Sequence, residues 1–193
     1  MDKPDLNYPN RVNLSKVLDN AHWARVLIDS CLENTSPDDD LHYEFGPMKT
    51  GPYLETRIRL FHFLQMTLPG KPCFEELDEF RSSDSEFDPD NWDNFVDHLA
   101  HIRRTSMALA EGDYYSLRLK SPSGFGFVRQ TELQRMVVMV NCSNLEITLS
   151  VPALTGAWIA GTGFVIGSGE SPASEITLGS YEGRLFESRK GLK

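Results

Sequence analysis

The stretch from residue 67 to residue 79 places the strongest constraint on the fold. Residues 67–74 read Thr-Leu-Pro-Gly-Lys-Pro-Cys-Phe, and an apolar segment with helical periodicity precedes them. Pro-Gly ends a helix and turns the chain, and Pro72 favours an extended conformation for the residue before it. An acidic cluster follows at residues 75–79. The order predicts a helix, a tight turn, a short buried strand and an acidic loop. Such an αβ unit is typical of a layered or barrel fold, with carboxylates at the C-terminal end of the strand.

Apolar residues at helical spacing predict three helices in the first part of the chain. Asn13 or Ser15 is the candidate cap of the first helix. The polar segment between the first two helices is unusually long for a compact domain. The expected helices cover residues 14–32, 54–67 and 91–110.

The character of the sequence changes after Gly112, where short β-branched and aromatic runs alternate with turns. Their spacing, near ten residues, indicates an antiparallel sandwich. The expected strands are Tyr114–Leu119, Phe125–Gln130, Arg135–Val140, Leu145–Val151, Ala157–Ala160, Phe164–Ile166, Glu175–Leu178 and Arg184–Glu187.

Composition excludes some classes of function. Apolar residues make up 40% of the chain and charged residues 24%, as in ordinary globular proteins. The net charge of −9 argues against nucleic-acid binding, because phosphate recognition needs a basic surface. No run approaches the roughly 20 apolar residues that span a bilayer, and the N-terminus lacks the apolar core of a signal peptide.

The sequence predicts neither a metal nor a cofactor. Cys31, Cys73 and Cys142 are widely spaced, which favours buried thiols over a disulfide with one free cysteine. His98 and His101 share a face of a predicted helix, a spacing compatible with metal binding. No cysteine or carboxylate cluster clearly joins them, so solvated or capping histidines are the favoured interpretation.

Three Asn-x-Ser/Thr triplets are candidate N-glycosylation sites, at Asn13, Asn34 and Asn141. They matter only if the chain enters the secretory route.

Several segments resemble the α-amylase superfamily of glycoside hydrolases (family 13). Residues 4–8, Pro-Asp-Leu-Asn-Tyr, are similar to a segment of its oligo-glucosidase-like branch. Residues 60–80 resemble the stretch through barrel strand eight. Residues 102–117 resemble the helix before the C-terminal β-domain, and residues 135–141 its central strand.

Non-enzymatic relatives give a further resemblance. Residues 43–47, 54–57 and 121–129 are similar to the ectodomains of the heavy chains of heteromeric amino-acid transporters, such as the CD98 heavy chain. Heavy chains of this kind escort a transporter light chain to the plasma membrane. The resemblance therefore implies a light-chain partner and a place on the extracellular face of that membrane.

The resemblance implies an α+β fold in two parts. Residues 1–110 would be a helical remnant of the end of a (β/α)8 barrel, and residues 111–193 an antiparallel β-sandwich. The alternative to a heavy-chain ectodomain is the C-terminal portion of an α-glucosidase or α-amylase family hydrolase. A starch-binding module is a third possibility, so carbohydrate binding stays open.

The family's catalytic segments are not found in the sequence. Glycoside hydrolysis needs two positioned carboxylates. Active members carry the nucleophile in a G-F-R-x-D segment and a further carboxylate in an N-H-D segment, and neither occurs here. Asp78 and Glu79 match the family's acidic pair, but residues 75–77 are Glu-Glu-Leu where Tyr-Tyr-Gly is usual. We therefore expect a non-catalytic polypeptide with a vestigial acidic pair in a solvated loop.

An incomplete barrel should be less stable than a closed one. Parallel strands need neighbours on both edges, so missing strands would expose edges and apolar helix faces. We therefore expect an ordered β-domain and poor packing in residues 1–55.

Overall fold

The computed structural model describes residues 11–14, 18–34, 41–44, 52–72, 89–150, 157–162, 169–170 and 175–188. The predicted strand Phe164–Ile166 lies outside these residues. The elements, in chain order, are β1 (Arg11–Asn13), α1 (Ala21–Asn34), β2 (His42–Glu44), α2 (Leu54–Thr67), α4 (Pro89–Thr105), α5 (Met107–Glu111), β3 (Asp113–Leu117), β4 (Gly124–Gln130), β5 (Arg135–Asn141), β6 (Ile147–Ser150), β7 (Ala157–Gly161), β8 (Gly169–Glu170), β9 (Glu175–Leu178) and β10 (Gly183–Ser188).

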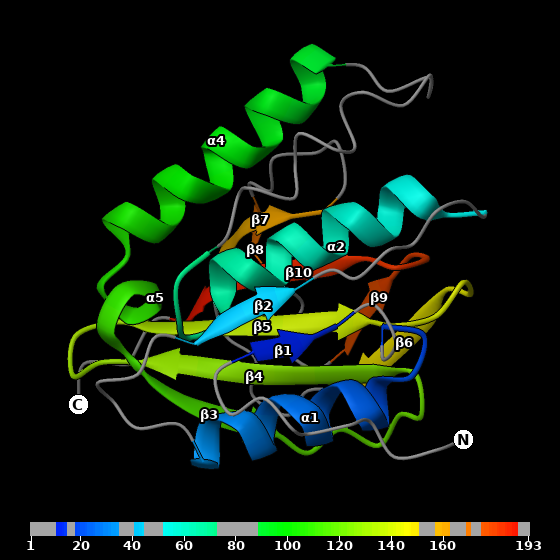
Figure 1. Ribbon diagram of the computed structural model, residues 1–193, viewed down its shortest axis with the longest axis horizontal. Coiled ribbons are helices and arrows are strands. Elements are labelled where there is room, and N and C mark those ends of the chain that lie inside the picture. Colours follow the sequence, from blue (N-terminus) through cyan, green and yellow to red (C-terminus); the bar gives the residue numbers. More distant parts are fainter. Residues whose placement is uncertain are drawn as a thin grey trace.

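A six-stranded antiparallel sheet forms the centre of the molecule, in the order β3-β4-β5-β10-β7-β8 (Figure 1). Its central strand β5 reads Arg-Met-Val-Val-Met-Val-Asn, and six of its seven residues are buried. A strand that is buried on both faces needs this continuous apolar run rather than alternation. Both faces of the sheet are therefore covered.

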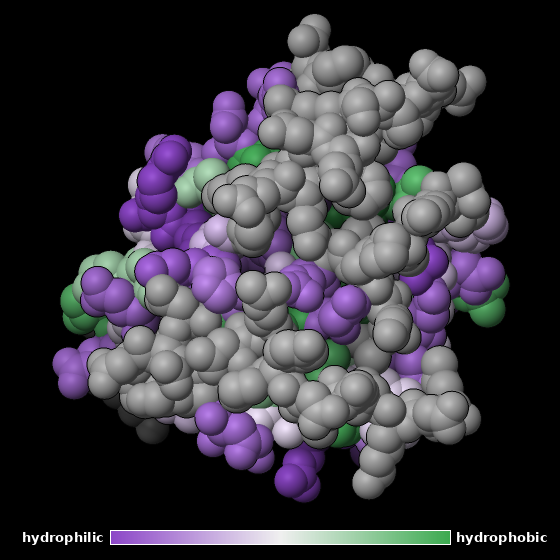
Figure 2. Space-filling view, viewed as in Figure 1, coloured by the Kyte–Doolittle hydropathy of each residue, from purple (hydrophilic) through white to green (hydrophobic). Residues whose placement is uncertain are grey.

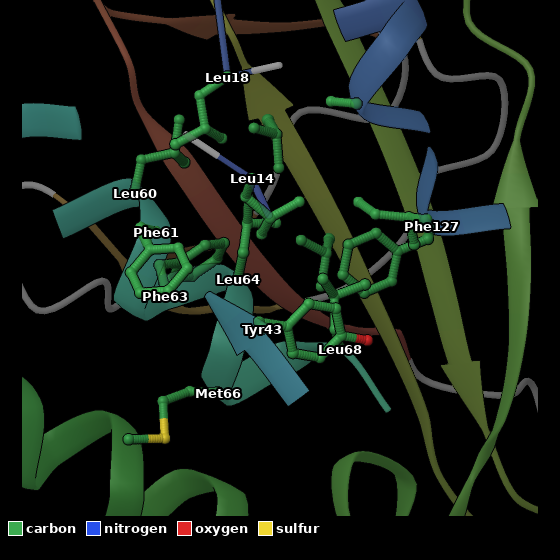
Figure 3. Close-up of a cluster of buried hydrophobic side chains, with 14 of the residues drawn as sticks. Leu14, Leu18, Tyr43, Leu60, Phe61, Phe63, Leu64, Met66, Leu68 and Phe127 are labelled. Atoms are coloured by element: carbon green, nitrogen blue, oxygen red, sulfur yellow. The ribbon is translucent and has the colours of Figure 1, made fainter. Parts of the chain in front are cut away.

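The first face carries the larger core. Side chains of β4, β5 and β10, such as Phe127, Val138 and Leu185, are fully buried there. Residues from α1, α2 and the two short strands β1 and β2 pack over them (Figure 3). The leucines and phenylalanines of α2 supply much of this layer, with Leu60, Phe63 and Leu64 all fully buried.

A second, smaller sheet covers the other face. Strands β6 and β9 pair in antiparallel fashion, with Leu149 opposite Ile176. Both side chains are buried in a separate cluster that includes Val137 and Phe186 from the large sheet. The predicted antiparallel sandwich is thus confirmed, with helices on its far side.

The short strands β1 and β2 pair in parallel, with Val12 beside Tyr43. Helix α1 joins them, which makes a βαβ unit. Helix α2 then leads to Lys71, which forms a parallel bridge to His42. Two successive crossovers through helices are the repeat of a βα barrel, in agreement with the prediction from the turn at residues 67–74.

Helix α1 is shorter than predicted. It begins at Ala21, and Asn20 caps it, because the Asn20 Oδ1 atom accepts a hydrogen bond of 3.1 Å from the Trp23 amide. Leu14 and Leu18 are fully buried but precede the helix, so their apolar spacing is not helical. The predicted caps Asn13 and Ser15 are therefore wrong.

The predicted third helix is two helices, α4 and α5, separated at Ser106. The Ser106 hydroxyl accepts from the Leu109 amide at 3.2 Å and donates to the Gln134 side chain at 2.9 Å. This N-cap starts a new helix in a new direction. Figure 1 shows α4 leaning away from the sheet while α5 returns to it.

The expectation that residues 1–55 pack poorly is wrong for the described residues. Val12, Leu14 and Ile28 have no exposed surface, and Tyr43 is 1% exposed. All four belong to the same core as Phe127 of the large sheet. The predicted boundary between residues 110 and 111 falls in the last turn of α5, shortly before β3, and it does not divide this core.

The visible surface of the described residues is mostly hydrophilic, with hydrophobic residues in small, separate areas (Figure 2). Among the described helices, none is both long and apolar enough to cross a membrane.

Candidate functional site

The turn that ends α2 joins the barrel-like part to the rest of the chain. Gly70 has a φ of 111°, and a Cβ atom there would lie 2.4 Å from the Leu41 carbonyl oxygen. Only glycine fits this left-handed position without strain. The Lys71 amide then donates to the same carbonyl at 3.0 Å, which starts the parallel bridge.

Arg103, on α4, binds the main chain of this turn. Its guanidinium donates to the carbonyls of Met66 and Leu68 at 2.9 Å and of Gly70 at 2.6 Å. These carbonyls lack helical partners because α2 ends there, and the helix C-terminus favours a cation. Burial lowers the pKa of Arg103, which the nearby Tyr43 partly offsets.

Arg129, on β4, performs the same role at the next junction. It donates to the Gly112 carbonyl at 2.9 and 3.0 Å and to the Thr67 carbonyl at 3.2 Å. Burial lowers its pKa to about 10, and the positive charge of Arg103 contributes. No sequence pattern indicates the role of either arginine, because their acceptors are backbone atoms far away along the chain.

Barrel chemistry occurs at the C-terminal edge of the parallel strands. At that edge the structure places a polar cluster of Asp19, Arg57 and Tyr181. The Asp19 carboxylate accepts hydrogen bonds of 2.7 Å from both the Tyr181 hydroxyl and the Arg57 guanidinium. Burial and the Asp19 carboxylate raise the pKa of Tyr181 to about 12. Asp19 is thus engaged in joining α2 to the β-domain, and the adjacent hollow has only about 220 Å³.

A much larger groove, of about 1350 Å³, lies at the opposite, N-terminal edge of the parallel strands. Helix α1 forms one wall and strand β3 the other, with Leu41 and residues 69–71 between them. Charged residues of both signs and two tyrosines line it. Its place in the fold separates it from the edge at which barrel enzymes hold their catalytic groups.

The predicted acidic pair, Asp78 and Glu79, lies outside the described residues. Of the three predicted glycosylation sites, Asn34 is exposed at the end of α1 and Asn13 is half-buried in β1; both stay predictions. Asn141 is fully buried.

The environment of Asn141 contradicts a glycan at that position. Its side-chain amide donates to the carbonyls of Leu145 at 2.7 Å, Gly179 at 2.6 Å and Leu178 at 3.4 Å. The nitrogen that would carry the sugar is therefore buried and holds the loops on either side of it together. The triplet is a structural element of the β-domain.

Cys31 and Cys142 are buried, as predicted, whereas Cys73 lies outside the described residues. Burial raises the pKa of both thiols, so neither is a reactive thiolate at neutral pH. Within the described ranges, no three His, Cys, Asp or Glu side chains gather to bind a metal, and His98 and His101 join no such group.

Comparison with known proteins gives similarity at the level of fold. A mutant of the trehalulose synthase MutB, solved in complex with Tris, matches 86% of this chain with a TM-score of 0.65 and 11% identity. Isomaltulose synthase from Erwinia rhapontici NX5 matches the same share with a TM-score of 0.64 and 10% identity. Another MutB mutant, in complex with its substrate sucrose, gives 0.62 and 12%. No protein-family model matches the chain, and no curated protein matches it either.

These sucrose isomerases belong to the α-amylase superfamily, glycoside hydrolase family 13. The chain covers 46% of their length in these matches. The fold therefore resembles part of the fold of these synthases, a mixed structure of a few helices and an antiparallel sheet.

Proposed function

We propose that this chain is the C-terminal portion of an α-amylase-superfamily carbohydrate-active protein and carries no glycoside chemistry by itself. One observation carries the proposal. The parallel series β1, β2 and Lys71 shares a single core with the antiparallel sheet, and this arrangement matches sucrose isomerases over 86% of the chain. Its role would be to close and stabilise a barrel whose other strands hold the reacting groups.

The chemistry of the described C-terminal edge supports a non-catalytic role. Hydrolysis with retention needs two carboxylates about 5 Å apart, one of them protonated. The Asp19 carboxylate instead accepts hydrogen bonds from both Arg57 and Tyr181, so its two oxygen atoms are already engaged. A group held in this way is a poor proton donor or nucleophile.

Incubating the purified chain with sucrose and with an aryl α-glucoside tests the proposal. We expect no glucose, fructose or isomaltulose above the level of a heat-denatured control. Turnover that disappears in the double variant Asp78→Asn/Glu79→Gln would show that the chain is an enzyme. That variant also tests the acidic pair directly.

A transporter heavy-chain ectodomain is the second candidate, supported by the resemblance of residues 43–47 and 121–129. In that case the chain would bind a membrane transporter light chain at the extracellular face of the plasma membrane. The coding sequence upstream of Met1 separates the two. A transmembrane helix there would favour the heavy chain, whereas further barrel strands would favour the carbohydrate enzyme.

A further inference from the structure

Among the described residues, strand β3 pairs along one of its two edges only. It stands at the end of the six-stranded sheet, and β4 is its partner among the described strands. In an antiparallel strand with one neighbour, alternate residues direct their N–H and C=O groups away from that neighbour. Residues 113–116 and Arg118 line the large groove. Because consecutive strand residues point to opposite faces, the groove must follow the strand's edge.

Helix α1 forms the facing wall and is fixed against β3. The Tyr114 hydroxyl donates to the Asp29 carboxylate at 2.8 Å, and the Tyr114 ring packs on Phe127 at 5.3 Å between centroids. The edge is therefore accompanied by a rigid helix, as in domains that bind extended peptides by strand addition. Val26 and Tyr115 offer exposed apolar surface, with Tyr115 53% exposed.

The charges of the groove are separated along its length. Helix α1 runs in the direction of β4 and opposite to β3 (Figure 1). Arg25 and Arg118 consequently lie toward one end of the groove. Glu33 and Asp113 lie toward the other, where Lys71 also lines the wall. The two ends are about 16 Å apart along β3, at about 3.3 Å per residue.

We propose that this groove binds an extended peptide segment that adds as a strand to the edge of β3. The segment carries an acidic side chain and a basic side chain about five residues apart. Its acidic residue lies opposite Arg118, toward the end of the groove that holds Arg25, and its basic residue lies opposite Asp113, toward the end that holds Glu33. Antiparallel addition is the more stable arrangement, so the acidic residue comes first in the peptide.

Fluorescence anisotropy with labelled hexapeptides tests the proposal on the full chain. The probes are blocked Glu-Val-Thr-Val-Thr-Lys, the reversed charge order Lys-Val-Thr-Val-Thr-Glu, and a version of the first with proline at both valines. We expect the first to bind at least fivefold more tightly than the second. The proline version should bind more weakly, because two of its residues have no N–H group to donate to the strand edge and proline does not fit a paired strand.

A charge exchange in the groove gives the sharper result. The double variant Glu33→Lys/Arg118→Glu keeps the net charge and reverses the polarity of the groove. It should bind the Lys-first peptide in preference to the Glu-first peptide. The control Arg104→Glu/Glu175→Lys changes two exposed residues outside the groove, and it should retain the original preference.

Three outcomes would overturn the proposal. The first is that no probe binds up to millimolar concentration while circular dichroism shows the folded chain. The second is that the groove variant keeps the original preference. The third is that the edge has another occupant. A second copy of the chain would be shown by sedimentation and by loss of self-association in Glu33→Lys/Arg118→Glu. A malto-oligosaccharide would be shown by NMR chemical-shift changes confined to the ring signals of Tyr114 and Tyr115.

Discussion

At the scale of single residues, Gly70 has the most restricted position. We expect Gly70→Ala to lower the free energy of unfolding by about 2 kcal/mol or more, from a left-handed φ and a clash with backbone at Leu41. Urea denaturation measures this change. Gly179→Ala is the matched control, because an added Cβ there would meet a side-chain oxygen of Glu182, at 3.3 Å, and no backbone atom within 4 Å. Equal effects of the two substitutions would contradict the argument.

Burial of His62 should make the stability of the chain depend on pH. The side chain is 2% exposed and lies between Phe61 and Trp92 at the interface of α2 and α4. Burial lowers its pKa from 6.5 to about 4. Between these values the unfolded chain binds a proton that the folded chain does not, so stability falls as the pH falls from 6.5 to 4. The loss should reach about 3 kcal/mol.

Urea titrations at pH 7, 5.5 and 4.5 measure this slope. The variant His62→Gln should have a flatter dependence on pH, even if it is less stable at pH 7. His101 is exposed on α4, so His101→Gln should retain the slope of the parent chain. A slope that persists in His62→Gln would assign the effect to other groups.

At the scale of elements, the contact of α4 with the end of α2 depends on Arg103. We expect Arg103→Met to lower the free energy of unfolding by about 2–4 kcal/mol, because three carbonyls in the last turn of α2 and the turn after it lose a charged donor. Arg104 is the next residue of the same helix and is exposed. Arg104→Met should change stability by less than about 0.5 kcal/mol, as is usual for surface substitutions. Chemical denaturation compares the two.

The helices and strands also differ in how well the sequence predicted them. The predicted range of about 54–67 for α2 agrees with its bounds, because its apolar residues lie at helical spacing and Pro69 follows its end. The strands after Gly112 were close to their predicted bounds, since β-branched runs and turns alternate there. The short strands β1 and β2 were missed. Three residues are too few for a period, and these strands exist only because they pair with each other.

The candidate site was predicted less well than the fold. The motifs at Asp78 and Asn141 were visible in the sequence, but Asn141 is a buried structural amide. The groove was not foreseen, because it forms where α1 meets the edge of β3, more than 80 residues further along the chain. Its charges look like ordinary solvated residues until the elements are assembled.

At the scale of the whole molecule, the shared core predicts one cooperative unfolding transition. We expect amides of α1, such as Ile28, and of β5, such as Val138, to exchange with free energies within about 1 kcal/mol of each other. Native-state hydrogen exchange measures both. If α1 opened several kcal/mol more easily than β5, the barrel-like part and the sandwich would be independent units.

Arg103 and Arg129, the two arginines at the junctions, donate their hydrogen bonds to main-chain oxygen atoms. These hydrogen bonds depend on the path of the backbone and not on which side chains it carries. The two arginines therefore place no demand of their own on the side chains of this turn, provided that the chain still bends at Gly70 and presents the same carbonyls. What restricts Met66 and Leu68 is instead their burial in the core.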